Sequence, residues 1–223
     1  MSTTSPTYID DYTRPVNLSR DTTALVIVDM QNASGSRAHG LGKLLASQGK
    51  LADAEYRFAR IENVIIPNIA RLAASFRKAG VRLIYVTYGS NLRDFSDAPV
   101  HLKDWLVATN NRAGEAEHEI VPALAPQPGE LVLNKTTMGA FGSTAIDAHL
   151  KSMGISEIVV VGVSTNNCVG MTAMEAADRQ YGVVIVSDAT GTCSDEMQDA
   201  YLRTFRRLWG RVASTDEVIA EVT

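Results

Sequence analysis

The chain has 223 residues, 45% of them hydrophobic, which is enough for one large α/β domain with its own core. A net charge of −4, with no long basic or apolar run, predicts that it binds neither nucleic acid nor membranes. Two cysteines and an N-terminus without the basic and apolar regions of a signal peptide predict a reducing, cytoplasmic setting.

Buried strands are predicted to alternate with helices along most of the chain. Residues 1–20 are expected to form a polar arm, 21–223 a single domain, and 88–129 an insertion that serves as a lid or an interface. Apolar runs predict strands at 23–29, 81–87, 130–134, 157–162, 182–186 and 211–214. Helical spacing predicts helices at 41–46, 54–78, 144–153, 167–179 and 195–208, and a short one after the last strand.

Four residues are predicted to shape the helices. Pro67 should kink the helix at 54–78, and Gly80 should end it. Ser143 and Ser194 are expected to cap the helices that follow them.

The alternation of strands and helices predicts a three-layer, doubly wound and mostly parallel sheet. Functional groups in such sheets gather beyond the carboxyl ends of the strands. Asp29, Lys135 and Cys168 each follow a predicted strand there. Cys168 opens a predicted helix, whose N-terminus is expected to lower the pKa of the thiol.

A cysteine, a carboxylate and an amine at one sheet edge are suited to acyl transfer on an amide. Asp29 can take the proton of the Cys168 thiol and return it to a leaving amine, and Lys135 can balance the charges. Backbone N–H groups of the turn before Cys168 can stabilise the oxygen of the attacked carbonyl.

Three motifs, TALVIVDMQN, LNKTTMGAFGST and VVVGVSTNNCVGMTAMEAADRQYGVVIVSDAT, resemble those of the isochorismatase-like cysteine hydrolases. The resemblance covers about residues 22–210 and implies six mostly parallel strands in the order 3-2-1-4-5-6. It implies a catalytic triad of Asp29, Lys135 and Cys168. It also implies a cis peptide between Val163 and Ser164, with the N–H groups of Ser164 and Cys168 forming the oxyanion hole.

Departures from the motifs of individual branches narrow the expected activity. Nicotinamidases in the family hold a metal through an Asp-x-His pair, and the one such pair here, at 147–149, lies on the helix after Lys135. Isochorismatases proper lack the cysteine. The sequence therefore favours a cofactor-free and metal-free amidase that releases ammonia or amine from a small carbamoyl, ureido or amide compound. Gly170 stands where many members carry an acid.

Seven residues near the motifs are candidates for binding the substrate: Gln31, Asn32, Arg37, Tyr88, Arg93, Phe141 and Asn167. Arg37 and Arg93 can meet a carboxylate, but each also suits a surface or an interface. The aromatic residues, together with Trp105, can line a pocket or simply pack. Cys193 also follows a strand, and packing is its expected role.

Other functions remain open at this point. The chain can be a catalytically silent small-molecule-binding homologue, or a hydrolase of the nicotinamidase or isochorismatase type. Members of the family are usually oligomers, so a homodimer or homotetramer is expected.

Overall fold

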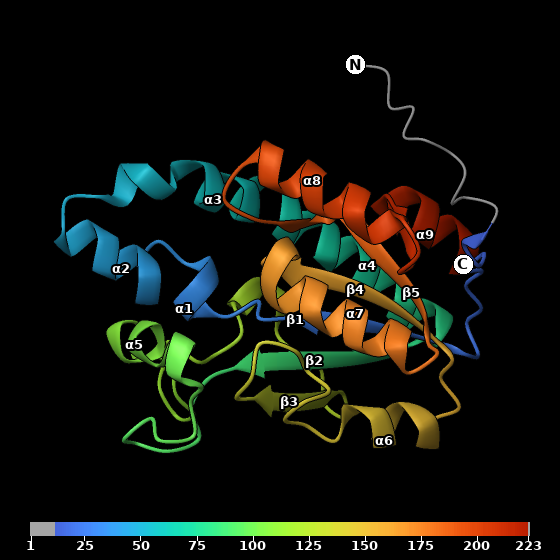
Figure 1. Ribbon diagram of the computed structural model, residues 1–223, viewed down its shortest axis with the longest axis horizontal. Helices are drawn as coiled ribbons and strands as arrows, with labels where there is room; N and C mark the ends of the chain where they lie inside the picture. Colours follow the sequence, from blue (N-terminus) through green and yellow to red (C-terminus); the bar gives the residue numbers. More distant parts are fainter. Residues whose placement is uncertain (1–11, 223) are drawn as a thin grey trace.

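The computed structural model describes residues 12–222, which contain one six-stranded sheet in the order β3-β2-β1-β4-β5-β6 (Figure 1). All neighbouring strands are parallel, so the predicted sheet and its strand order are confirmed. The strands are β1 Thr23–Val28, β2 Arg82–Tyr88, β3 Leu131–Lys135, β4 Glu157–Val163, β5 Gly182–Gly191 and β6 Arg211–Ala213.

The two central strands, β1 and β4, are buried on both faces, as their continuous apolar sequences predict. The pairing of β4 with β5 shifts in register between Val160 and Gly162. Gly162 has a φ of 113°, and a side chain there would collide with the carbonyl of Val28. This glycine therefore lets β1 and β4 stay close where both strands approach Cys168.

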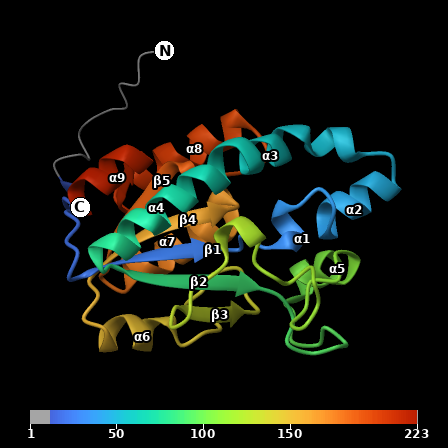
Figure 2. The same cartoon turned by 180° about the vertical axis from the view of Figure 1, so that it is seen from behind.

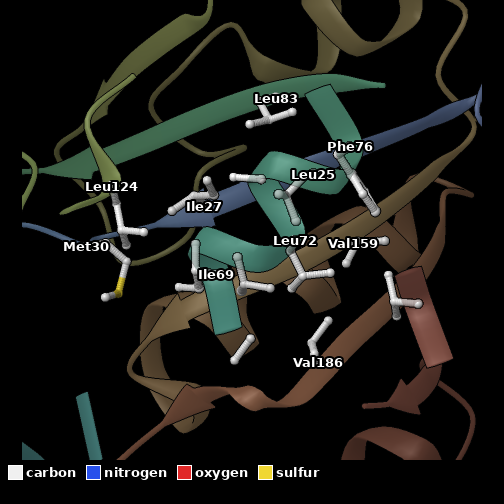
Figure 3. Close-up of a cluster of buried hydrophobic side chains, with 14 of the residues drawn as sticks. Leu25, Ile27, Met30, Ile69, Leu72, Phe76, Leu83, Leu124, Val159 and Val186 are labelled. Atoms are coloured by element: carbon white, nitrogen blue, oxygen red, sulfur yellow. The ribbon is translucent and has the colours of Figure 1, made fainter. Parts of the chain in front are cut away.

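Helices cover both faces of the sheet (Figures 1 and 2). One core contains side chains of α4 Ile66–Ala79 and α9 Thr215–Val222, and Figure 3 shows Ile69, Leu72 and Phe76 of α4 packed over β1. The opposite core contains side chains of three helices, which are α6 Ile146–Ser152, α7 Gly170–Asp178 and α8 Asp195–Arg206.

The helix predicted at 54–78 is present but interrupted. It consists of α3 Glu55–Arg60, a π-helical turn at Ile61–Ile65, and α4. Pro67 lies in the first turn of α4, directly after the π-helical turn. Proline has no backbone N–H to donate, so the regular hydrogen-bonding pattern of an α-helix is broken at this point. Gly80 ends α4 in the left-handed conformation with a φ of 78°, which confirms its predicted role.

The two predicted helix caps have different outcomes. The Ser194 side chain accepts a hydrogen bond from the Met197 N–H, so that cap is confirmed. The Ser143 cap is wrong, because α6 begins only at Ile146. The Ser143 hydroxyl instead accepts hydrogen bonds from the N–H groups of Thr136 and Thr137, and so shapes the turn after Lys135.

The short helices α1 Asn32–Gly35, α2 Gly40–Ser47 and α5 Val100–Ala108 lie beyond the carboxyl ends of the strands (Figures 1 and 2). Turns of 3₁₀ helix are present at Leu51–Ala54 and Pro122–Leu124. The insertion contains α5 and bonds back to the chain after β1, since Asn32 donates its backbone N–H to the Glu119 carbonyl. Much of the predicted arm, residues 1–11, lies outside the described residues. Between residues 12 and 222, no helix is long and apolar enough to cross a membrane.

Candidate active site

Asp29 and Lys135 form a buried ion pair across the sheet. Asp29 follows β1 and Lys135 ends β3, so the lysine side chain passes the intervening end of β2. Its Nζ lies 2.9 Å from Asp29 Oδ2 and 4.2 Å from the centre of the Tyr88 ring. The ammonium therefore has both a carboxylate and an aromatic face for partners.

The backbone holds Asp29 in a fixed position. Asp29 has a φ of 53°, a left-handed conformation that few non-glycine residues adopt. Its N–H donates to the Val86 carbonyl at 2.8 Å, and its carbonyl accepts from the Ser34 hydroxyl at 2.7 Å. These contacts turn the chain out of β1 and direct the carboxylate toward Lys135.

Cys168 completes the cluster from the other side. It lies in a π-helical turn, Thr165–Val169, directly before α7, and the charges of Asp29 and Lys135 both act on its thiol. The peptide bond between Val163 and Ser164, which leads into this turn, is cis.

The predicted lowering of the thiol pKa is wrong. Burial, reinforced by the negative charge of Asp29, raises the pKa of Cys168 to about 12, although Lys135 opposes this. Burial also raises the pKa of Asp29, despite the charge of Lys135. The thiol therefore favours its protonated form at neutral pH, whereas the ammonium of Lys135 favours the ionised form of Asp29.

Breaking the ion pair is expected to destabilise the protein. Lys135→Met leaves the Asp29 carboxylate buried and unpaired, which costs about 3–5 kcal/mol of unfolding free energy. The double variant Lys135→Met with Asp29→Asn removes that charge and should regain most of the loss. Urea denaturation measures both, and Lys151→Met, which breaks an exposed pair with Asp147, is the matched control. Equal destabilisation of the single and double variants would contradict this interpretation.

A cavity of about 270 Å³ opens beside Cys168. Residues predicted for the site that line it are Asp29, Gln31, Tyr88, Trp105, Ser164, Asn167 and Cys168. Trp105 on α5 stacks against Tyr88 with ring centres 6.2 Å apart, and Leu41 and Leu102 extend this apolar wall. The cavity thus has the size of a small-molecule site, with Asp29 and Cys168 in its wall and Lys135 buried behind Asp29.

Comparisons with known proteins show the family of this chain. Residues 23–217 match the model of the isochorismatase domain. The chain belongs to the isochorismatase family. It is 32% identical over 207 residues to the ureidoacrylate amidohydrolase RutB of Pantoea ananatis, covering 86% of this chain and 78% of the relative. It is 30% identical to the ureidoacrylate amidohydrolase RutB of Rhizobium rhizogenes, and the match covers 94% of this chain and 87% of that relative.

Solved structures share the fold of this isochorismatase-family chain. A cysteine hydrolase from Pseudomonas syringae pv. phaseolicola superposes with a TM-score of 0.78 at 24% identity, covering 93% of this chain and 97% of that one. The N-carbamoylsarcosine amidase of Thermoplasma acidophilum superposes with a TM-score of 0.65 at 24% identity, covering 87% and 97%.

Gln31 lines the cavity, but its amide is already bonded to the protein. Its Oε1 accepts from the Tyr88 N–H at 2.7 Å, and its Nε2 donates to the carbonyl of His118 at 2.8 Å. Gln31 therefore joins the ends of β1 and β2 to the insertion. These bonds favour a role in holding the pocket walls in place over direct contact with a substrate.

Two further candidates, Asn32 and Phe141, do not line the cavity. Asn32 donates its side-chain amide to the Ala116 carbonyl, because α1 turns it toward the insertion. Phe141 packs in the core beside α6 and α7, with its ring 5.9 Å from that of Tyr181. The substrate-binding roles predicted for these two residues are therefore not supported by their positions.

The two candidate arginines also lie outside the cavity. Arg37 forms ion pairs with Glu55 and Glu62, so its charge is already balanced at the surface. Arg93 is exposed on the loop before α5. Neither arginine is placed to meet a substrate carboxylate at Cys168.

Arg57 is the residue that the sequence analysis missed. It lies on α3, lines the cavity and is partly buried, with a hydrogen bond from Nη1 to the Ser164 hydroxyl at 2.8 Å. The helical periodicity could have predicted its position. Arg57 stands four residues before Ile61 and eight before Ile65, so it lies on the same face of the helix as these two buried residues.

Cys193 and Gly170 differ from expectation in informative ways. Cys193 is exposed and lines the cavity, so its predicted packing role is wrong. Strand β5 runs on to Gly191 and carries Cys193 out of the core.

A side chain at Gly170 would collide with the hydroxyl of Tyr201 and the carbonyl of Thr165. Gly170 therefore allows close packing of α7 against α8, which leaves no room for a side chain at this position.

The predicted absence of a metal stays a prediction. Over residues 12–222, no group of three or more His, Cys, Asp or Glu side chains is arranged to hold a metal ion. His118, which follows β2 in the chain, faces the side chains of Gln31 and Asn111.

Proposed function

We propose that the protein is an amidohydrolase in which Cys168 attacks a small carbamoyl, ureido or amide compound. The observation that carries this proposal is the thiol placed against the buried Asp29–Lys135 pair at the wall of a small cavity. Similarity to ureidoacrylate amidohydrolases over most of the chain supports hydrolysis of a C–N bond.

The first step follows from the protonated thiol. As the Cys168 sulfur attacks the carbonyl carbon, Asp29 takes the thiol proton, so that free thiolate need not accumulate. Lys135 keeps Asp29 ionised before the step and balances the negative charge that develops. The backbone N–H groups of Ser164 and Cys168 are proposed to stabilise the oxyanion.

The second step returns the proton. Asp29 protonates the leaving nitrogen, the C–N bond breaks, and ammonia or an amine departs from a thioester on Cys168. Asp29 then takes a proton from water, whose oxygen attacks the thioester carbonyl. The acid product leaves and the sulfur recovers a proton, which restores the starting state.

Rival functions give different results with the same protein. A catalytically silent homologue would bind such compounds without turnover, a nicotinamidase-type enzyme would hydrolyse nicotinamide, and an isochorismatase-type enzyme would cleave a vinyl ether. Several buried groups converge on the Cys168 thiol, which favours catalysis over binding alone. A cytoplasmic homodimer or homotetramer remains part of the proposal.

A substrate panel is expected to reveal ammonia release. Ureido acids, carbamoyl amino acids, simple amides and nicotinamide are incubated with the purified protein, and ammonia is measured by a coupled assay. Release from ureido or carbamoyl compounds, unchanged by chelators, is the expected result. Binding without release across the panel would contradict the amidohydrolase assignment, and sizing by light scattering tests the oligomeric state.

A further inference from the structure

The ammonium of Lys135 is held by an aromatic ring as well as by a carboxylate. Lys135 is fully buried, and its Nζ is paired with Asp29 Oδ2 at 2.9 Å. Its Nζ also lies over the face of the Tyr88 ring, 4.2 Å from the ring centre. The negative face of an aromatic ring attracts a cation, most strongly where water is excluded. The ring therefore supplies part of the stabilisation that water gives to an exposed ammonium.

The Tyr88 ring is itself fixed by its neighbours. Tyr88 is 4% exposed, and it ends β2 with both backbone groups bonded. Its N–H donates to Gln31 Oε1 at 2.7 Å, and its carbonyl accepts from Asn111 Nδ2 at 2.8 Å. The ring stacks against Trp105 with an angle of 22° between the two planes. These contacts keep the face of the ring turned toward Lys135.

The hydroxyl of Tyr88 takes no part in these contacts. It is buried and has no hydrogen-bond partner among residues 12–222. Burial, reinforced by the charges of Cys168 and Asp29, raises the pKa of Tyr88, so the side chain stays a neutral phenol at neutral pH. The aromatic face is therefore the part of Tyr88 that meets a charge.

The charge of Lys135 acts on both reacting groups of the proposed mechanism. It opposes the rise in pKa that burial causes for Asp29 and for the Cys168 thiol. Asp29 follows β1, Tyr88 ends β2, and Cys168 lies in the turn before α7, so these titratable groups meet the ammonium from three elements. A Coulombic effect weakens with distance. An ammonium that is held less firmly would act less on Asp29 and Cys168.

We propose that Tyr88 is a positioning residue, whose ring holds the Lys135 ammonium against Asp29 and thereby supports the proton transfers at Cys168. This inference rests on the proposed function, and it assigns a further residue to that same site. Trp105 belongs to the insertion and lines the cavity, so its stacking on Tyr88 also connects the pocket wall to the ion pair.

The test changes the charge distribution of the ring and keeps its shape. Tyr88→Phe, and variants with mono-, di- and trifluorinated phenylalanine at position 88, are prepared in a Cys193→Ala background, which leaves Cys168 as the one thiol in the chain. Fluorine withdraws electrons from the ring face and weakens its attraction for an ammonium. Relative to Tyr88→Phe, alkylation of Cys168 by iodoacetamide in mildly alkaline buffer is expected to slow with each fluorine, by about 3- to 10-fold in total.

Hydrolysis gives a second measurement on the same variants. Asp29 accepts the thiol proton in its ionised form, so activity is lost as the pH falls through the pKa of Asp29. A weaker effect of Lys135 raises that pKa. The acid limb of kcat/KM is therefore expected to move to higher pH with each fluorine, with kcat reduced and KM unchanged because the ring keeps its shape.

The matched control is the same fluorinated series at Phe141. That ring lies 5.1 Å from Arg179 Cζ and outside the cavity, so alkylation of Cys168 should stay unchanged. Equal alkylation rates for all variants at Tyr88 would overturn the inference. A larger loss from Tyr88→Phe than from fluorination would overturn it as well, because the hydroxyl would then be the active group. Since alkylation needs no turnover, slowing by fluorine in a protein that releases no ammonia would reject the proposed function and keep the role of Tyr88.

Discussion

Cys168→Ala is expected to lower the rate of ammonia release by about 10⁴-fold or more, because Cys168 is the thiol on which the charges of Asp29 and Lys135 act, and its loss removes the proposed nucleophile. The charges of Asp29 and Lys135 act on this thiol, and the substitution leaves the rest of the pocket wall unchanged. The variant should therefore fold and bind substrate. Steady-state ammonia release and calorimetric binding, measured on one preparation, check both expectations.

Cys193→Ala is the matched control for this variant. Cys193 is the other cysteine, it lines the same cavity, and it is more exposed than Cys168. Turnover within about tenfold of wild type is expected for it, since Cys168 is the thiol that acts on the pKa of Asp29. Loss of turnover in Cys193→Ala, with retention in Cys168→Ala, would reverse the assignment of the nucleophile.

The parallel sheet and the position of Asp29, Lys135 and Cys168 at its edge could be predicted because they depend on local patterns. Apolar runs such as that of β1 show which strands are buried on both faces of the sheet. The polar residues that follow these strands show which side chains come together at the carboxyl edge of the sheet. Asp29, Lys135 and Cys168 all follow from that rule. The motifs then supplied the order of the strands.

The substrate pocket could not be predicted in the same way, because its lining depends on side-chain direction in irregular segments. Asn32 and Arg37 lie close to Asp29 in the sequence, but the short helix α1 and the loop after it carry them away from the cavity. Arg57 is distant from Asp29 in the sequence, and it reaches the cavity because its position on α3 places it on the face of the helix that is turned inward. The pKa of Cys168 could not be predicted either. Burial and the charge of Asp29 raise it, and these effects exceed the lowering expected from a helix N-terminus.

Asp29→Asn is expected to have opposite effects on the two reactions of Cys168. Hydrolysis should fall by about 10²- to 10⁴-fold, because the group that moves the proton is lost. Alkylation of the thiol by iodoacetamide at neutral pH should become faster. The charge of Asp29 raises the thiol pKa and that of Lys135 lowers it, so removing Asp29 lowers the pKa and increases the thiolate fraction.

The experiment uses a Cys193→Ala background, so that Cys168 is the one thiol in the chain. Alkylation is followed by mass spectrometry across a pH series, and Asp147→Asn, at a carboxylate paired with Lys151 on the surface, is the control. Slower alkylation in Asp29→Asn would mean that Asp29 sustains a resting thiolate. Faster alkylation together with lost hydrolysis separates thiolate formation from catalysis, and would show that the enzyme depends on moving the proton during attack.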